Sequence, residues 1–430
     1  MRWVTGILVL AMAAPAAAQQ ASAPQGLEVT LTDALQKALL VQPGMVSAQG
    51  SVRSANAQML ANSGSFLPTV IVSGNSSRSG GSQIVGNQIV QTPARTSFSG
   101  NLSLNLDLFT GFRRIASRRA ADASQDAADA GLINQRYQVI LQTKQAFYNA
   151  IANEELVRVA EAQVARTRQQ LQISTEKLRA GSATRSDSLR SVVELGNAQI
   201  ALLQAQANLA FSQASLGRQI GVDQAVRAVP DSTLPPAPDT TGIREAALSS
   251  APQVRQSEAQ ARAARAQVWV SRSAYWPTFS TSLSKGSSGG IAPWTSTTGY
   301  TDNWAVRFSV SLQLFNGFAR EQQITNSSVA RDNADAVAAD TRRLVNASLT
   351  QAIAGLQTAS AQLAISRDNV AAATEDMRVQ QERYRVGAAT ILDLLTSQAS
   401  LTQALVNQVQ SRFNYLVSRA TLEALVGHEL

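Results

Sequence analysis

The sequence of 430 residues contains no cysteine and only one histidine, His428. Without cysteine the chain has no disulfide framework, no thiolate metal site and no attachment point for an N-terminal lipid. It also has no glycine-rich phosphate loop after a strand, no nucleophile motif and no metal-like cluster of Asp and Glu residues. We therefore expect a protein that is not an enzyme and that needs neither a cofactor nor a metal.

Aromatic residues make up only 5% of the chain, and lysine supplies only four of its 37 basic residues. The net charge is +8, but the arginines are scattered among Asp, Glu and Gln, and the nearest approach to a patch is Arg113, Arg114, Arg118 and Arg119. A nucleic-acid site requires a basic stripe with interleaved stacking aromatics. A solvated helix face is the better interpretation, and we expect no nucleic-acid partner.

Long hydrophobic runs are also rare, and the only apolar run near the N-terminus is short. Residues 1–18 combine a positive start at Arg2, apolar residues from Val4 to Met12 and small residues up to Ala18, which predicts a cleaved export signal. The alternative, an N-terminal membrane anchor, needs about 20 apolar residues. An exported chain without another such run is either soluble or a membrane protein of the β type.

What the chain does contain is an internal duplication. The segment EKLRAGSATRSD at residues 176–187 returns as ERYRVGAATILD at residues 382–393, an offset of 206 positions. The segments LFTGF at 108–112 and LFNGF at 314–318 have the same offset. Gly181 and Gly387 can supply the positive φ that closes a helix, so each copy predicts the tip of a helical hairpin. The chain is therefore two versions of one unit.

The predicted units are residues 19–229 and 243–430, joined by a proline-rich linker at 230–242. Each consists of a half-length helix, two strands, a long helix and a return helix. In the first unit we expect strands at about 69–79 and 97–108, a long helix at about 115–180 and a return helix at about 184–220. In the second we expect strands at about 278–285 and 303–314, a long helix at about 319–386 and a return helix at about 390–426.

The residues between the strands of each pair, 75–96 and 287–301, are rich in Ser and Gly and predict polar loops. The strands alternate apolar and polar residues over about ten positions, the span of a transmembrane β-strand. Four strands cannot close a barrel, and hydrocarbon does not tolerate an open edge, so strands in a membrane require several chains to share one barrel. The alternative is a small soluble sheet that caps a coiled coil.

The long helices carry heptad patterns typical of coiled coils, with Lys144 in the one missing apolar slot of the first. The first return helix continues the heptad at Leu189, Val193, Gly196, Ile200 and Leu203.

The export signal, the duplication, the order of elements, the LFxGF endings and the Arg-x-Gly tips together resemble the TolC family of bacterial outer-membrane efflux proteins. The resemblance covers essentially the whole chain after the signal and, since cysteine is absent, is closer to the unlipidated members. It implies a mainly helical fold with a membrane β part: a homotrimer whose twelve-stranded β-barrel continues as a twelve-helix periplasmic α-barrel.

The resemblance also implies an outer-membrane channel that is the passive exit duct of a tripartite efflux pump or a type I secretion system. Its expected partners are outer-membrane lipid, a periplasmic adaptor protein and an inner-membrane transporter of the RND, ABC or MFS type. A soluble periplasmic coiled-coil scaffold is the alternative from a different class.

The family resemblance implies a gate at the periplasmic tips. Asp393 resembles the constriction aspartate, of which a trimer places three around the axis, where like charges raise each other's pKa and attract cations. The family often has a second Asp three residues later, but Thr396 stands there, so we expect a weaker ring. Asp187 and Tyr384 resemble the pair that links the two hairpins by a charge-assisted hydrogen bond.

Two further groups of residues belong to this expected gate. Arg185 and Arg190 flank Asp187 and can reach either aspartate, although solvated charges at helix ends remain an alternative for all of these residues. The tip residues correspond to the grooves where the family meets its adaptor, although the two glycines can also act as helix caps alone. The tip residues are Ala180, Gly181, Ser182, Val386, Gly387 and Ala388.

Overall fold

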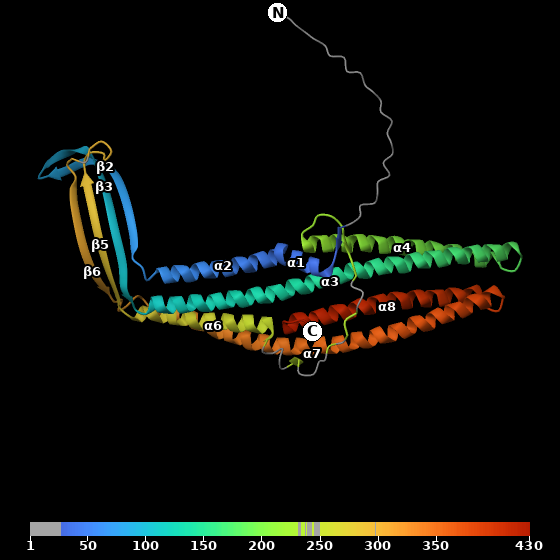
Figure 1. Cartoon of the computed structure of the whole chain (residues 1–430). Coiled ribbons are helices and arrows are strands. Elements are labelled where there is room, and N and C mark those ends of the chain that lie inside the picture. The colour runs from blue at the N-terminus through green and yellow to red at the C-terminus, as the bar shows by residue number, and fades with distance from the viewer. Residues whose placement is uncertain (1–26, 231–233, 237, 239–242, 245–249, 297) are drawn as a thin grey trace, which may run out of the picture.

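The computed structural model describes residues 27–230, 234–236, 238, 243–244, 250–296 and 298–430. The molecule is elongated, with a four-stranded sheet at one end and the turns of two helical hairpins at the other, while the C-terminus lies near mid-length (Figure 1). The predicted signal at 1–18 and most of the predicted linker at 230–242 lie outside the described residues.

The two halves of the chain follow one order of elements. The first contains β1 (Leu27–Val29), α1 (Leu31–Val41), α2 (Pro43–Gly64), β2 (Thr69–Val85), β3 (Gln88–Thr110), α3 (Arg113–Arg179), α4 (Arg185–Ile220) and β4 (Val226–Ala228). The second contains α6 (Pro252–Arg272), the 3-10 helix η1 (Ser273–Tyr275), β5 (Thr278–Gly289), β6 (Thr301–Ser311), α7 (Ala319–Arg385) and α8 (Ile391–Val426). The mainly helical fold with a duplicated unit is as predicted.

The long helices α3 and α7 have 67 residues each, and the return helices α4 and α8 have 36 each. At 1.5 Å per residue the long helices measure about 100 Å. Helices of this length pack side by side as hairpins, because no single compact core can surround them. No helix in the described part of the chain is both long and apolar enough to cross a bilayer.

Each passage from the sheet into a long helix is a sharp turn made by the duplicated LFxGF segment. Gly111 and Phe112 have φ of 62° and 65°, and Gly317 and Phe318 have φ of 66° and 64°. Phe112 and Phe318 are the non-glycine residues with positive φ in the described chain, a conformation that is rare for a bulky residue. The repeated motif therefore corresponds to a repeated backbone constraint where the strands end.

The sheet is antiparallel with the order β2-β3-β5-β6, so β2 and β6 are its edges. Opposite residues share a face, and Leu104, Leu283 and Val306 lie in one row across three strands on the apolar face. The neighbouring row on the other face is Ser103, Ser284 and Ala305. The 12 residues of β5, tilted by about 45°, cover roughly 28 Å, which matches the apolar band of a membrane barrel.

The prediction of a loop at 75–96 was wrong. β2 and β3 pair from Thr69 opposite Asn105 to Val85 opposite Gln88, with one irregularity between Ser79 and Gly81. β5 pairs with β3 only as far as Phe98, so the outer part of the β2–β3 hairpin projects beyond the sheet. The strands here do not alternate apolar and polar residues, because both faces of the hairpin are exposed and backbone hydrogen bonds alone hold the pair together. The sequence pattern therefore gave no sign of them.

Other predicted boundaries also differ from the structure. The last strand was expected at 303–314, but β6 ends at Ser311, so the alternation at Leu312 and Leu314 continues past the paired segment. The predicted loop at 287–301 is shorter, since β5 runs to Gly289 and β6 begins at Thr301.

The two return helices differ in how they bury their apolar heptads. In α8, Val409 and Phe413 are buried against α1, α3 and α4. In α4, Leu189, Ile200 and Leu203 are 56%, 65% and 66% exposed. These apolar heptad positions of the first return helix are therefore left uncovered within the described part of a single chain.

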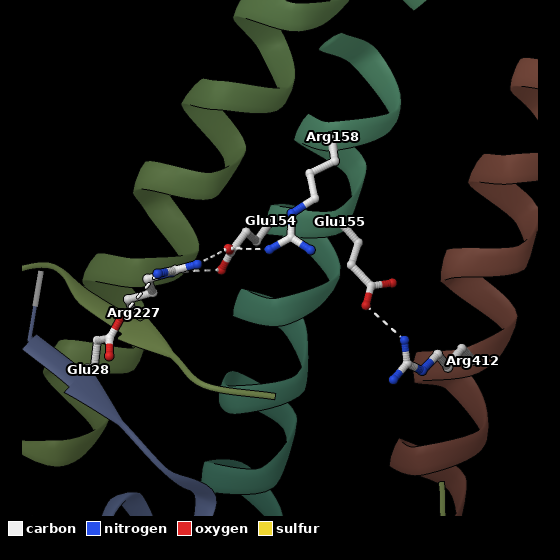
Figure 2. Close-up of polar contacts among 6 residues, drawn as sticks. All are labelled: Glu28, Glu154, Glu155, Arg158, Arg227 and Arg412. Atoms are coloured by element: carbon white, nitrogen blue, oxygen red, sulfur yellow. Dashed lines mark hydrogen bonds and ion pairs between the residues drawn. The ribbon is translucent and has the colours of Figure 1, made fainter. Parts of the chain in front are cut away.

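Near mid-length, short elements tie the two hairpins together (Figure 2). β1 and β4 form a parallel pair, and Arg227 of β4 contacts Glu28 of β1 at 3.1 Å and Glu154 of α3 at 2.7 Å. Glu155, the next residue after Glu154, forms a 2.8 Å ion pair with Arg412 of α8. This arrangement of charges joins the first half of the chain to the last helix.

Lys144, the polar interruption in the heptad of α3, is buried and forms a 2.6 Å ion pair with Glu423 of α8. Arg419 contacts the same carboxylate at 3.1 Å and also donates to the carbonyl of Pro236 in the linker. The missing heptad slot is therefore a specific polar link between the two repeats.

Candidate functional site at the helical tips

The two hairpins turn through a pair of closely matched tips. Gly181 and Gly387 have φ of 73° and 80°, and each follows the last turn of a long helix. The amide of Ser182 donates to the carbonyl of Lys177 at 2.9 Å, and that of Ala388 donates to Arg383 at 2.7 Å. These bonds satisfy the carbonyls at the helix ends, so both glycines act as caps. No described atom lies within 4 Å of a Cβ built on either glycine, so both turns are open on this side.

Both return helices begin with the same capping box. The side chain of Thr184 accepts from the amide of Asp187, whose carboxylate accepts from the Thr184 amide at 3.0 Å and from its hydroxyl at 2.8 Å. Thr390 and Asp393 repeat this arrangement, with distances of 2.9 Å and 2.7 Å. These reciprocal bonds satisfy two backbone donors at each helix start, so both aspartates have a structural role within the chain.

The capping bonds also set the charge of the two aspartates. The pKa of Asp187 lies below its ordinary value, chiefly because the Thr184 backbone donates to it and, to a lesser extent, because Arg190 lies nearby. The pKa of Asp393 is lowered chiefly by the Thr390 side chain, with a smaller contribution from Arg383. Both carboxylates are therefore ionised at neutral pH in the single chain.

Tyr384 is one of the buried residues of the tip region. It packs with Ile391 and Leu394 in a small apolar cluster, and its hydroxyl lies beside the Gln170 side chain of α3. Burial raises the pKa of Tyr384, and the negative charge of Asp187 raises it further. A buried hydroxyl that loses its hydrogen-bond partner is costly, so this position is sensitive to how the two hairpins pack.

Lys177 makes a direct contact between the two hairpin tips. Its ammonium nitrogen lies 4.0 Å from the centroid of the Tyr384 ring and donates to the Tyr384 backbone carbonyl. A cation over an aromatic face is attracted by the negative face of the ring. Lys177 thus connects the end of α3 to the end of α7.

The structure brings some of the predicted gate residues together and leaves others apart. Asp187, Arg190 and Tyr384 line one pocket of about 440 Å³, together with Lys177. The hydrogen bond expected between Asp187 and Tyr384 is not among the contacts of the described residues, because the carboxylate is engaged in its own helix cap.

The remaining predicted gate residues lie on the surface of the single chain. Arg185, Asp393 and Thr396 are exposed, and Thr396 donates to the carbonyl of Leu392 one turn earlier in its own helix. Ala389 lines the same pocket as Tyr384.

Sequence reasoning missed three residues that organise this site. Thr184 and Thr390 could have been found, because a Thr three residues before an Asp at a helix start is the signature of a capping box. Lys177 gives no such signal, since its partner Tyr384 is 207 residues away in the sequence. Asp376 and Ser397 add a second tip contact, a 2.5 Å hydrogen bond between α7 and α8.

Comparison with known proteins agrees with this architecture. Residues 34–222 and 243–428 match the outer membrane efflux protein family. The chain is 25% identical over 410 residues to the outer membrane efflux protein BepC of Brucella suis biovar 1, covering 93% of this chain and 86% of BepC. It is 26% identical over 390 residues to protein CyaE of Bordetella pertussis, covering 88% and 79% of the two chains.

Solved channels share the fold at low sequence identity. The CmeC outer membrane channel of Campylobacter jejuni superimposes with a TM-score of 0.80 at 17% identity, covering 92% of this chain and 85% of CmeC. The open-state MtrE outer membrane channel of Neisseria gonorrhoeae superimposes with a TM-score of 0.75 at 18% identity, covering 93% and 89%. The chain belongs to the outer membrane efflux protein family: it is a channel of the outer membrane with a periplasmic extension, not an enzyme, and serves as an exit duct.

Proposed function

We propose that this chain works as a homotrimeric, passive duct of an efflux pump or type I secretion system, gated at its helical tips. The observation that carries the proposal is the sheet, whose edge strands β2 and β6 have no neighbour on their outer sides within the described chain. Unpaired backbone groups are not tolerated in hydrocarbon. Pairing β6 of one copy with β2 of the next removes every edge, and three copies give a closed barrel of twelve strands.

The exposed heptad of α4 supports the same assembly. Leu189, Ile200 and Leu203 form an apolar stripe that a neighbouring copy can cover, while α7 exposes Val337, Leu344 and Ile365. In a ring of hairpins the α4 of one copy packs against the α7 of the next, as α3 and α8 pack within a chain. The soluble scaffold alternative leaves both the sheet edges and these stripes uncovered.

The gate is proposed at the tips, where charged and aromatic side chains meet. Lys177 links the two hairpins of one chain at Tyr384, and Asp187 lies in the same pocket. Opening a ring of hairpins requires them to move apart, so contacts between hairpins hold the closed state. Asp393 and Thr396, exposed in one chain, are proposed to face the axis and to form the ring of three carboxylates.

The partners follow from the orientation of the tips. A periplasmic adaptor is proposed to dock in the grooves beside Gly181 and Gly387, where the turns expose backbone without side chains. An inner-membrane transporter of the RND, ABC or MFS type is proposed to supply the energy for passage through this passive duct.

Single-channel recordings in planar bilayers test the gate. Tyr384→Phe and Asp187→Ala are expected to raise the conductance, because the first removes the hydroxyl that faces Gln170 of α3 and the second removes a negative charge from the pocket that Lys177 and Tyr384 share. Asp340→Ala is the matched control, since Asp340 lies on the exposed surface of α7 in an i,i+3 pair with Arg343. Unchanged conductance in both tip variants would remove this gate assignment, and a water-soluble monomer would remove the channel itself.

A further inference from the structure

An open cavity of about 950 Å³ lies where the strands meet the helices. It is formed by the start of α3, the end of α6, η1 and one residue of α7, and is rich in arginine and aromatic side chains. The residues that define it here, and that we call the junction cavity, are Phe112, Arg119, Arg265, Trp269, Arg272 and Trp276. The tip gate makes no use of it.

The junction cavity carries unbalanced positive charge. Arg265 is neutralised by Asp335, to which it forms a 2.8 Å ion pair. Arg119 and Arg272 have no ion-pair partner among the described residues, and Arg272 lies 5.4 Å from the centroid of the Trp269 ring. No Asp or Glu is among the residues that line the cavity. Its chemistry therefore fits an anion next to apolar groups.

A chain of aromatic contacts places the cavity on the apolar side of the sheet. Phe279 lies opposite Val310 and thus shares the face of Leu283 and Val306. From Phe279 the rings continue to Phe109 at 5.9 Å, from Phe109 to Phe112 at 5.1 Å, and from Phe112 to Trp276 at 5.6 Å between centroids. The face that meets acyl chains in the proposed barrel therefore leads directly into the arginine-lined cavity.

The cavity also lies at the depth in the proposed membrane where lipid headgroups are found. Gly111 directly follows the end of β3, and Trp276 lies two residues before the start of β5. A Cβ built on Gly111 would lie 2.7 Å from the Trp276 Cβ, so the two positions are in close contact. This is the helical, and hence periplasmic, end of the strands, where aromatic and basic side chains meet lipid headgroups. The cavity lies below the two central strands rather than below the edges that neighbouring copies would cover.

We propose that the junction cavity binds the phosphate headgroup of an anionic phospholipid from the periplasmic leaflet, with its acyl chains along the Phe279 face. Arg119 and Arg272 hold the phosphate, and Trp269 and Trp276 flank the glycerol region. The proposal rests on the membrane placement of the sheet but not on the tip gate. It also gives a role to part of the arginine cluster at residues 113–119.

Native mass spectrometry of the full chain, extracted from membranes and supplied with lipid, tests the proposal. Phosphatidylglycerol is expected to remain bound in preference to phosphatidylcholine, and Arg119→Gln with Arg272→Gln is expected to reduce its occupancy on the order of tenfold. The charge-matched control is Arg168→Gln with Arg262→Gln, two exposed arginines on α3 and α6 outside the cavity. Conductance of the same samples shows whether the channel is intact.

Each outcome decides the matter. Equal retention of phosphatidylglycerol by the cavity variant and the control overturns the proposal, as does equal retention of the two lipids by the unmodified chain. Displacement of the lipid by millimolar inorganic phosphate assigns the cavity to a free anion instead. Stronger quenching of tryptophan fluorescence by brominated phosphatidylglycerol than by brominated phosphatidylcholine is expected in the unmodified chain, and equal quenching by the two lipids contradicts the proposal. Retained conductance with lost lipid preference leaves the duct proposal standing.

Discussion

Replacing Glu423 by Gln should destabilise the protein more than any single change on its exposed surface. The carboxylate lies 2.6 Å from the Lys144 nitrogen, and both side chains are only 11% exposed. Removing one partner leaves the Lys144 ammonium buried without a counter-charge, which costs about 3–5 kcal/mol. A surface pair such as Arg343–Asp340, with side chains 73% and 74% exposed, contributes about 0–1 kcal/mol.

This cost can be converted into a melting shift. Unfolding entropy is about 2.1 cal/mol/K per residue, so a chain of 430 residues has about 0.9 kcal/mol/K. A loss of about 3–5 kcal/mol then lowers the melting temperature by roughly 3–5 °C. An assembly of several chains gives the same shift, because the number of pairs and the entropy increase together.

A double variant separates the buried charge from the loss of contact. Lys144→Met with Glu423→Gln removes the unpaired ammonium and keeps an acceptor within reach of Arg419, which also donates to Pro236. We expect it to recover most of the stability lost in Glu423→Gln, since neutral replacement of a buried pair is often nearly neutral in free energy. Differential scanning calorimetry measures the melting temperatures of the unmodified protein, the Glu423→Gln variant and the double variant, each solubilised in detergent. A double variant as unstable as the single one would refute the reasoning.

Three further predictions concern the mid-length cluster and the tips. The hydrogen bond from Arg227 lowers the pKa of Glu154 below the ordinary 4.5 and outweighs the opposing effect of burial. The ionised Glu154 therefore stabilises the protein at pH values above 4.5, and this stabilisation is lost as the pH falls through the lowered pKa. Arg227→Gln should flatten this pH dependence in melting curves recorded from pH 7 to pH 3. Gly387→Ala places an alanine at φ of 80°, which is unfavourable for a residue with a side chain. We therefore expect amide hydrogen exchange in the second tip to accelerate about fivefold or more. The control Gly355→Ala adds a Cβ in open space within α7 and should leave this exchange unchanged. Thr390→Ala removes the hydroxyl of the capping box and should accelerate exchange in the first turn of α8 by about fivefold, while Thr374→Ala, on the exposed face of α7, serves as the control.

The helical part of the fold could be predicted because its signals are local and repeated. The two tips, the LFxGF turns and the long stretches without proline appear twice at one offset, so each copy supports the interpretation of the other. The outer β2–β3 hairpin was missed because Ser, Gly and Asn leave no apolar face, and its pairing is a property of two segments together.

The site was predictable only in its position. Duplication pointed to Asp187 and Asp393, and the threonine three residues before each of them also indicates a capping box, although the bonds themselves are seen only in the structure. Lys144 appeared as a gap in a heptad, and its partner Glu423 is 279 residues away. The sequence pattern of one chain does not reveal such contacts between repeats. It also does not reveal which apolar stripes stay exposed in one chain and can be covered by a second copy.

The number of chains in the membrane-extracted complex tests the central claim most directly. Native mass spectrometry of the protein released from outer membranes should give the mass of three mature chains, because only shared strands pair both β2 and β6. A single chain recovered from the water-soluble fraction, with its sheet edges and α4 stripe uncovered, would contradict the account.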